Sequence, residues 1–125
     1  MILDTCALLF LAVGDRRLSK RIRRQLSAAP LRRFCAISSF EIALKWQQGK
    51  LELPVPPSEW VSEMIGRYRL TEIPLDSALC VAAAQLPPHH RDPFDRFIIA
   101  TALLLRAPVV TIDPKFVPYG VEVLN

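Results

Sequence analysis

The sequence predicts an α/β domain whose sheet is mostly parallel and covered by helices on both faces. Two observations support this fold class. Short apolar runs alternate along the chain with longer segments of helical periodicity. These runs also show little alternation between apolar and polar residues, which is typical of strands buried on both faces. The length of 125 residues fits one domain, which we expect to span residues 1–125.

Five short segments are expected to form the strands. In chain order they are Met1–Leu3, Phe34–Ile37, Thr71–Pro74, Val109–Ile112 and Val121–Leu124. The first run stops at Asp4, and a loop containing proline and glycine separates the last two. Ligands of parallel sheets bind in the crevice outside the carboxyl ends of the strands, so we expect the functional residues there.

Six segments are expected to be helical. They are residues 5–12, closed near Gly14; Asp15 to Pro30; Ser38 to about Gly49; Ser58 to about Tyr68; a helix that Asp76 caps and that ends before Pro87; and Asp92–Arg106. In the third segment, Phe40, Ala43 and Leu44 are expected to form the apolar side. The last segment is apolar almost all round, so we expect it to lie centrally.

Composition excludes several classes of protein. Hydrophobic residues make up 51% and charged residues 22% of the chain, which excludes a disordered tail. The three cysteines are widely spaced and form no metal-binding pattern, so we expect reduced thiols in small apolar sites of a cytoplasmic protein. No segment is long enough to cross a bilayer and no signal peptide is evident, so no membrane association is expected.

Four acidic residues fall at the expected carboxyl edge, and each also has a plain structural explanation. Asp4 is placed to cap the helix after it, and Asp113-Pro114 is typical of a turn. Glu41 completes a capping box with Ser38 and is spaced to pair with Lys45. Asp95 is an acid in a first helical turn, where the helix dipole favours it.

Considered together, these acids indicate a metal site. Asp95 shares a helical face with apolar residues and should point inward. Two unit charges about 4 Å apart repel by about 4 kcal/mol at an effective dielectric constant of 20, so a cluster of carboxylates needs a cation or protons. Carboxylate oxygens suit Mg²⁺, with Mn²⁺ as a plausible substitute. Hydrolysis of phosphodiesters is the chemistry that uses such a cluster.

Four stretches of the chain together resemble PIN-domain proteins, and the VapC toxins of bacterial toxin–antitoxin pairs most closely. They are Leu3-Asp4-Thr5, the stretch Ser38–Lys45, the stretch His90–Ala100 with its D-P-F-D-R motif, and the T-x-D-x-x-F stretch Thr111–Phe116. They occur in the family's order and cover the chain from Asp4 to Phe116. The D-P-F-D-R stretch before an apolar helix is fairly specific. The sequence departs from the pattern at Cys6, where histidine is common, and we expect a small buried thiol there.

The resemblance implies a three-layer α/β/α sandwich and a Mg²⁺-dependent endoribonuclease. It also implies a homodimer that a cognate antitoxin protein inhibits. It places the catalytic, metal-binding acids at Asp4, Glu41, Asp95 and Asp113. The hydroxyls of Thr5 and Thr111 would support them, and Asp92 would be a helix cap or a nearby partner of the site.

Basic residues are candidates for contacting RNA. Eight of them crowd into Arg16–Arg33, which is either a solvated helix face or a track for the RNA backbone. Arg91, Arg96 and Lys115 neighbour the acids and are the better candidates for holding the scissile strand. The pair His89 and His90 is expected to lie in a surface loop.

We therefore predict a metal-dependent ribonuclease that is the toxin of a toxin–antitoxin pair. The main alternative is a non-catalytic PIN-like module that binds RNA or protein. Another is a phosphatase of the haloacid-dehalogenase type, but that group requires D-x-D after its first strand, and this chain has Asp4-Thr5-Cys6. Nucleotide-dependent enzymes are disfavoured because neither a P-loop nor G-x-G-x-x-G is present.

Overall fold

The computed structural model describes all 125 residues and has one five-stranded sheet in which every neighbouring pair of strands is parallel. The strands are β1 (Ile2–Leu3), β2 (Arg32–Cys35), β3 (Leu70–Ile73), β4 (Val109–Val110) and β5 (Val123–Leu124). The helices are α1 (Thr5–Val13), α2 (Lys20–Ala28), α3 (Ile37–Gln47), α4 (Pro57–Tyr68), α5 (Ser77–Gln85), α6 (Pro93–Leu105) and the 3-10 helix η1 (Pro114–Tyr119). The predicted α/β/α sandwich is confirmed.

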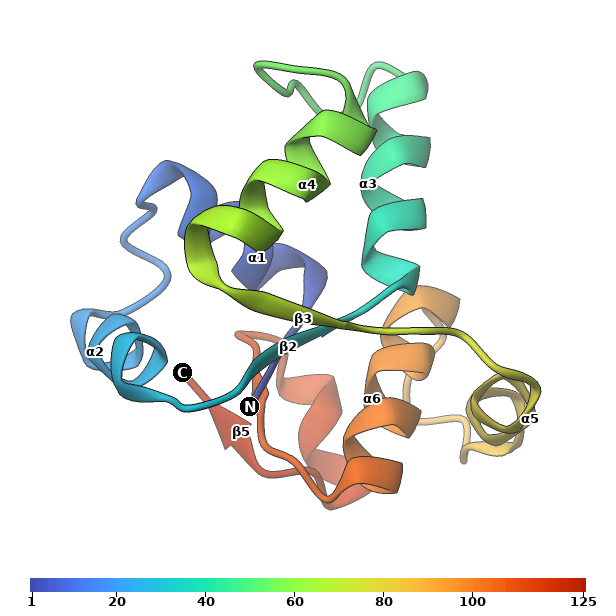
Figure 1. Cartoon of the computed structure of the whole chain (residues 1–125). Coiled ribbons are helices and arrows are strands. Elements are labelled where there is room, and N and C mark those ends of the chain that lie inside the picture. The colour runs from blue at the N-terminus through green and yellow to red at the C-terminus, as the bar shows by residue number, and fades with distance from the viewer.

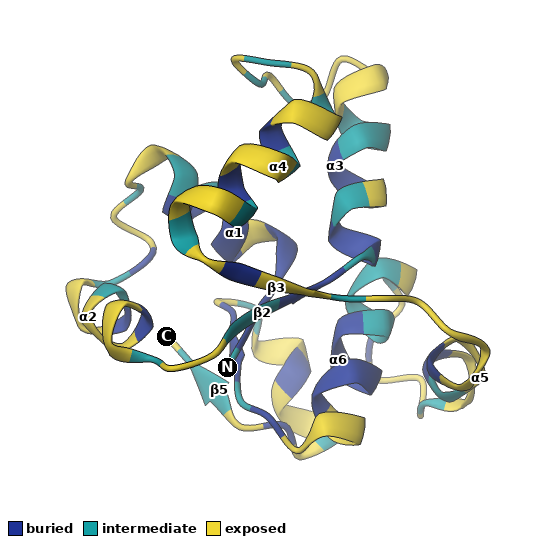
Figure 2. Ribbon diagram, in the orientation of Figure 1, coloured by how far each residue is buried: buried dark blue, intermediate teal, exposed yellow.

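Helices cover both faces of the sheet (Figure 1). Successive residues of a strand point to opposite faces. Leu3 and Val110 accordingly pack in the core formed with α1 to α4, whereas Ile2 and Val109 pack in the second core, formed with α5 and α6. Buried residues follow the strands and the inner faces of the helices on both sides (Figure 2). Strands β1 and β4 are therefore apolar in every position, whereas β2 begins with Arg32 and Arg33 and is apolar only at Phe34 and Cys35.

The order of the strands places a crevice at the middle of the sheet. The order is β3-β2-β1-β4-β5, so the chain builds outward from β1 in one direction and later returns to add β4 on its other side. A parallel sheet opens at its carboxyl edge where the winding direction changes, which here is between β1 and β4. Asp4 directly follows β1, and Thr111 directly follows β4. These two positions flank the crevice.

Strand β4 ends at Val110 rather than Ile112, and β5 begins at Val123 rather than Val121. Two further predicted boundaries are wrong for local reasons. The second helix begins at Lys20 rather than Asp15, because the Asp15 carboxylate accepts hydrogen bonds from the backbone and side chain of Arg17 and forms a turn. Ser19 then caps the helix by accepting from the amide of Ile22 at 3.2 Å. Strand β2 occupies Arg32–Cys35 rather than Phe34–Ile37, because α3 already begins at Ile37.

The inward face of α3 also differs from the expected one. Ser38, Glu41 and Ile42 are buried, whereas Phe40 is 57% exposed. The predicted capping box is absent, because Ser38 lies inside the helix and its hydroxyl accepts a hydrogen bond from Thr5 at 2.9 Å. Polar residues occupy the inward face because they have partners there, which a purely apolar criterion does not detect.

Three further expectations need correction. The loop after β4 contains η1, whose Phe116 is fully buried. Helix α6 is buried from Ile98 to Ala102, but the three leucines at its carboxyl end are exposed. All three cysteines are free, yet only Cys35 is buried, whereas Cys6 and Cys80 are exposed.

No helix of the protein has both the length and the apolar character needed to cross a bilayer.

Candidate metal centre

Asp4 is a buried carboxylate at the crevice between β1 and β4. The residue is 4% exposed, and its Oδ1 accepts a hydrogen bond of 2.6 Å from the amide of Ala7, which caps α1. Burial raises the pKa of Asp4 to about 6, hydrogen bonds from Thr111 and Ala7 lower it, and the charges of Glu41 and Asp113 raise it. The capping role is thus confirmed, and the same carboxylate also feels the charges of other acids.

Asp95 lies in the first turn of α6 and points inward, as its helical face predicts. Its side chain is 19% exposed. Burial raises the pKa of Asp95 to about 7, and the charges of Asp92, Asp4 and Glu41 contribute to the shift. Asp92 is the N-cap of the helix, where its Oδ1 accepts from the amide of Phe94 at 2.9 Å. The two acids of the D-P-F-D motif therefore differ, because one closes the helix end and the other faces the cluster.

Glu41 reaches the same region from α3. It is 4% exposed, and its Oε2 lies 3.2 Å from Nζ of Lys45, which confirms the predicted ion pair. The neighbouring Thr5 hydroxyl donates to Ser38 and thereby joins the start of α1 to α3. This hydrogen bond holds the start of α1 against the helix that carries Glu41.

Asp113 completes the set from the turn after β4. Its Oδ1 accepts from the amide of Lys115 at 2.9 Å, and its own amide donates to the hydroxyl of Thr111 at 3.0 Å. Thr111 is buried beside Asp4 and stabilises the ionised form of that acid. The hydroxyl of Thr111 therefore forms hydrogen bonds with Asp113, after β4, and with Asp4, after β1.

His90 lies in the site rather than in the surface loop that the sequence predicts for it. It is 4% exposed, and its Nε2 lies 2.8 Å from Oδ2 of Asp113 and 3.1 Å from Oδ2 of Asp95. This nitrogen and one carboxylate oxygen each of Asp95 and Asp113 lie within 4.8 Å of one another. Only His89 has the expected exposure. A histidine two residues before a helix cap lies outside any periodic pattern, so no signal in the sequence marks it as buried.

The donor set fits a hard divalent cation. Oxygens of Asp95 and Asp113 lie within 4.8 Å of each other, whereas Asp4 and Glu41, which come from two further elements, are linked to Asp95 through their charges. Each carboxylate oxygen has two acceptor positions, so the hydrogen bonds to backbone amides leave further positions free. The only lysine paired with the cluster is Lys45. Oxygen donors of this kind suit Mg²⁺ or Mn²⁺.

Comparison with known proteins identifies the family. The PIN domain model matches residues 1–121, which is nearly the whole chain. The chain belongs to the PIN domain family. No curated protein matches it.

Two solved structures are similar to this PIN domain in fold. One is described as FitAB bound to an IR36 DNA fragment, with a TM-score of 0.68 and 22% sequence identity, covering 99% of this chain and 93% of that chain. The other is FitAcB from Neisseria gonorrhoeae, with a TM-score of 0.62 and 22% identity, covering 99% and 96%. At this identity the likeness concerns the fold.

The three basic residues near the acids of the PIN domain differ in availability. Arg91 and Lys115 are exposed. Arg96 is half-buried, and its guanidinium donates to backbone carbonyls of Ala84, Leu86, Pro87 and His90 at 2.7 to 3.2 Å. Arg96 thus holds the loop between α5 and α6 in place, which leaves Arg91 and Lys115 as the freer candidates for contact with RNA.

The basic segment Arg16–Arg33 also divides into engaged and free side chains. Arg17 pairs with Asp15 at 2.7 Å and lies 4.1 Å from the centre of the Phe10 ring. Arg23 donates to the carbonyls of Leu18 and Asp15. Exposed side chains without a hydrogen bond or ion pair remain at Arg16, Lys20 and Arg24. Both a solvated face and a track for RNA are compatible with this arrangement.

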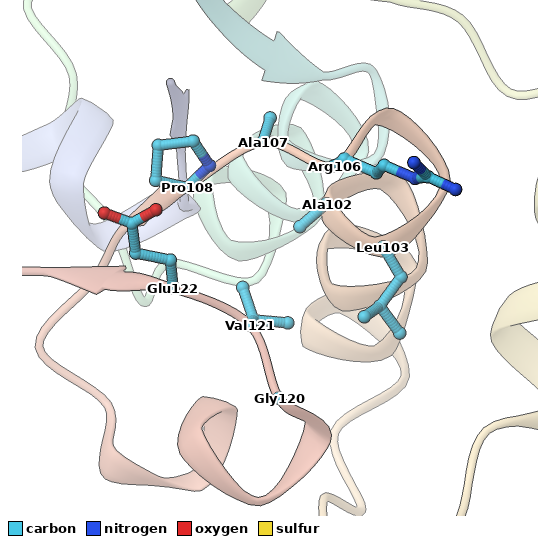
Figure 3. Close-up of a pocket in the computed structure, with 8 residues that line it drawn as sticks. All are labelled: Ala102, Leu103, Arg106, Ala107, Pro108, Gly120, Val121 and Glu122. Atoms are coloured by element: carbon cyan, nitrogen blue, oxygen red, sulfur yellow. The ribbon is translucent and has the colours of Figure 1, made fainter.

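A separate hollow of about 270 Å³ lies at the opposite edge of the sheet, before the starts of β4 and β5. Its charged lining residues are Arg106 and Glu122, which extend from opposite sides of it (Figure 3). It contains no group of acids or histidines, so it does not compete with the cluster at the carboxyl edge as a metal site.

Proposed function

We propose that this PIN domain is a Mg²⁺-dependent endoribonuclease that acts as the toxin of a toxin–antitoxin pair. Membership of the PIN family, whose members are generally nucleases, supports a hydrolase. The observation that carries the proposal is the carboxylate cluster at the crevice between β1 and β4, where burial and mutual repulsion raise the pKa of Asp4 and Asp95. A divalent cation would offset this repulsion.

Four acids would hold the ion, with Mn²⁺ as an alternative to Mg²⁺. They are Asp4, Glu41, Asp95 and Asp113. When bound, the ion would supply an activated water and neutralise charge on the phosphate. Thr111 orients the site through its hydrogen bond from the Asp113 amide, and Lys45 balances part of the charge of Glu41. Arg91 and Lys115 are placed to attract the RNA backbone to this edge.

The substrate and the partners rest on the resemblance to VapC proteins. That resemblance supports RNA as the substrate, a cognate antitoxin as the inhibitor and a homodimer as the assembly. The two similar structures are named FitAB and FitAcB, and these composite names support a protein partner for this chain. Analytical ultracentrifugation of the purified chain, alone and with the product of an adjacent reading frame, measures both forms of association.

The decisive test replaces Asp4 or Asp95 by asparagine. Asparagine removes the charge but still caps a helix, so Asp4→Asn should fold. We expect cleavage of a labelled RNA in the presence of Mg²⁺ to fall at least about 100-fold in each variant, a loss of about 2.7 kcal/mol of transition-state stabilisation. The matched control is Asp76→Asn, which changes the N-cap of α5, an acid whose carboxylate accepts from the amide of Leu79 and is not among the charges named above for Asp4 and Asp95. Full cleavage by Asp4→Asn or Asp95→Asn would refute the nuclease assignment.

The non-catalytic alternative makes a different prediction. A module that only binds RNA or protein needs no ion, so Mg²⁺ and Mn²⁺ would leave its unfolding temperature unchanged. A nuclease that holds the ion in its native state is stabilised by it, by about 2.7 kcal/mol at a concentration 100 times the dissociation constant. Thermal unfolding with and without each ion separates the two functions.

A further inference from the structure

The imidazole of His90 touches two acids of the cluster but has no role in the proposed function as stated so far. Its Nε2 lies 2.8 Å from Oδ2 of Asp113 and 3.1 Å from Oδ2 of Asp95. These two acids come from different elements, α6 and the turn after β4. A single nitrogen thus links two carboxylates that would otherwise repel each other.

The other ring nitrogen determines which atom carries the proton. Nδ1 of His90 accepts a hydrogen bond of 3.2 Å from the backbone amide of Asp92. A backbone amide can only donate, so Nδ1 must present its lone pair. In the neutral ring the proton is then on Nε2, and this nitrogen donates to Asp113.

This tautomer argues against His90 as a metal ligand. A ligating imidazole offers the lone pair of one nitrogen to the ion and donates the hydrogen of the other to an acceptor. Here Nε2 faces the carboxylates as a donor, and the partner of Nδ1 is itself a donor. Coordination through Nε2 would move the proton to Nδ1 and set two N–H groups against each other.

The surroundings of His90 keep the ring in this orientation. The ring packs edge-on against the buried Phe116, with 6.0 Å between centroids. The amide of His90 donates to the Tyr119 hydroxyl at 2.8 Å, and its carbonyl accepts from Arg96 at 3.2 Å. The Tyr119 hydroxyl in turn donates to the carbonyl of Pro87 at 2.6 Å. Both the ring and the main chain of His90 are therefore fixed by several elements.

We propose that His90 is a positioning residue of the metal centre, whose Nε2–H donates to Oδ2 of Asp113 while the same nitrogen lies 3.1 Å from Oδ2 of Asp95, so that the imidazole directs both carboxylates toward the ion without binding it. The inference rests on the proposed function, because it concerns the same carboxylates. It assigns Arg96 and Tyr119 a supporting part, since they hold the backbone on which the imidazole sits.

Two substitutions of His90 separate positioning from ligation. Glutamine carries an N–H at a position similar to Nε2, so His90→Gln keeps a donor for the carboxylates. His90→Leu is apolar and removes it. The matched control is His89→Leu, the same change one residue earlier at an exposed ring that packs on Tyr119 and contacts none of the acids. Circular dichroism and thermal unfolding establish that each variant is folded.

The first readout is the affinity for ions, measured by calorimetric titration with Mg²⁺ and, separately, Co²⁺. Loss of a group that orients the ligands typically costs about 10- to 100-fold in metal affinity. We expect a loss of that size for both ions in His90→Leu, and an affinity within about threefold of the unmodified protein in His90→Gln and His89→Leu. The proposal is overturned if a folded His90→Leu binds Mg²⁺ normally, if His90→Gln is as weak as His90→Leu, or if only Co²⁺ binding is lost.

The second readout is the tautomer itself, which does not depend on activity. Long-range ¹H–¹⁵N spectra of the labelled imidazole show which nitrogen carries the proton. We expect the Nε2–H form with and without Mg²⁺ or Zn²⁺, whereas conversion to Nδ1–H on addition of an ion would identify His90 as a ligand and overturn the proposal. If the unmodified protein binds neither Mg²⁺ nor Mn²⁺, the proposed function fails instead, and the inference falls with it. Normal ion binding by the unmodified protein combined with normal binding by His90→Leu refutes the inference alone.

Discussion

Asp4 serves two purposes at once. Its carboxylate satisfies an amide at the start of α1, and it also lies within the electrostatic reach of Glu41 and Asp113. An N-cap on a surface helix needs no burial, but Asp4 is almost completely buried. The hydrogen bond to the Ala7 amide therefore fixes the orientation of the Asp4 carboxylate. The position of Asp4 at the end of β1 brings that carboxylate near Glu41 and Asp113.

The raised pKa values of Asp4 and Asp95 predict a specific dependence of stability on pH. In the unfolded chain the pKa of both acids is about 3.8, whereas in the folded protein burial raises that of Asp4 to about 6 and that of Asp95 to about 7. As the pH rises, the native state therefore keeps these two protons up to a higher pH than the unfolded chain does. Their contribution to stability is fully present below about pH 4 and is lost as the pH rises through about 6 to 7.

Comparison with Asp4→Asn isolates the part due to Asp4. One pKa unit corresponds to about 1.4 kcal/mol, so the shift of Asp4 from 3.8 to about 6 corresponds to about 3 kcal/mol. Between about pH 4 and pH 7, without divalent ions, the free energy of unfolding should decrease in both proteins. We expect the decrease measured by urea denaturation to be smaller in Asp4→Asn than in the unmodified protein, by about this amount. Equal pH profiles for the two proteins would contradict the assignment of a raised pKa to Asp4.

At the residue scale, the sequence predicts the acids but not their neighbour. Asp4 and Asp113 are marked by their places after strands, Asp95 by its place in a first helical turn, and Glu41 by its place one helical turn beyond a strand. In the structure Asp4 follows β1, Asp113 lies in the turn after β4, and the charges of Asp4 and Glu41 act on Asp95. His90 has no such mark. Its burial depends on Phe116 and Tyr119, which approach from η1, a segment whose prolines and glycine predict a loop.

At the scale of elements, α1 and α3 are joined by a buried pair of hydroxyls. Thr5 begins α1, and Ser38 lies in the first turn of α3. Their hydrogen bond of 2.9 Å is inaccessible to water, because both residues are almost fully buried. The hydrogen bond thereby fixes the start of α1, next to Asp4, relative to α3, which carries Glu41.

Removing one hydroxyl of this pair should destabilise the protein. Thr5→Val keeps the shape of the side chain but leaves the Ser38 hydroxyl buried without its partner, which costs about 1–3 kcal/mol. Thr5→Ser keeps the donor and should be less destabilised, mainly through the missing methyl group. Urea denaturation of the three proteins measures the difference. Equal stability of Thr5→Val and the unmodified protein would show that the hydrogen bond contributes nothing net.

Helix periodicity predicts most helices correctly and fails where polar residues face inward. The caps at Asp4, Asp76 and Asp92 all form as their residue types indicate. In α3 the buried stripe includes Ser38 and Glu41 rather than Phe40, because hydrogen bonds and an ion pair compensate their burial. Such compensation depends on residues distant in the chain, so a local pattern does not contain it.

At the scale of the whole molecule, positive charge is spread unevenly. The formal net charge is +4, while the carboxylate cluster is locally negative. Free cationic side chains lie on the segment from Arg16 to Arg24, and Arg91 and Lys115 lie near the acids. RNA would gain affinity from these cations mainly through release of counterions, which depends on charge and not on base sequence.

This distribution predicts how neutralised variants bind RNA. We expect the double variant Arg16→Gln with Lys20→Gln to bind a single-stranded RNA more weakly and with a shallower salt dependence. The slope of the logarithm of the binding constant against the logarithm of the salt concentration should become shallower by about 0.7 for each phosphate that no longer has a cation beside it. The control with equal charge is Lys50→Gln with Arg106→Gln, two exposed cations elsewhere. Fluorescence anisotropy over a series of salt concentrations compares them. Equal slopes for both double variants would favour the interpretation of Arg16–Arg33 as a solvated face.

The position of β1 has a consequence for the order of synthesis. In β1, Ile2 and Leu3 pair with Arg33 and Phe34 of β2 on one side and with Val109 and Val110 of β4 on the other. The central strand therefore gains its second neighbour only when residues more than 100 positions later in the sequence have been made. A nascent polypeptide still on the ribosome lacks that neighbour until residues 109 and 110 have been synthesised, and Asp113 follows three residues later. A product truncated before these residues would therefore lack both a partner strand of β1 and one of the four acids.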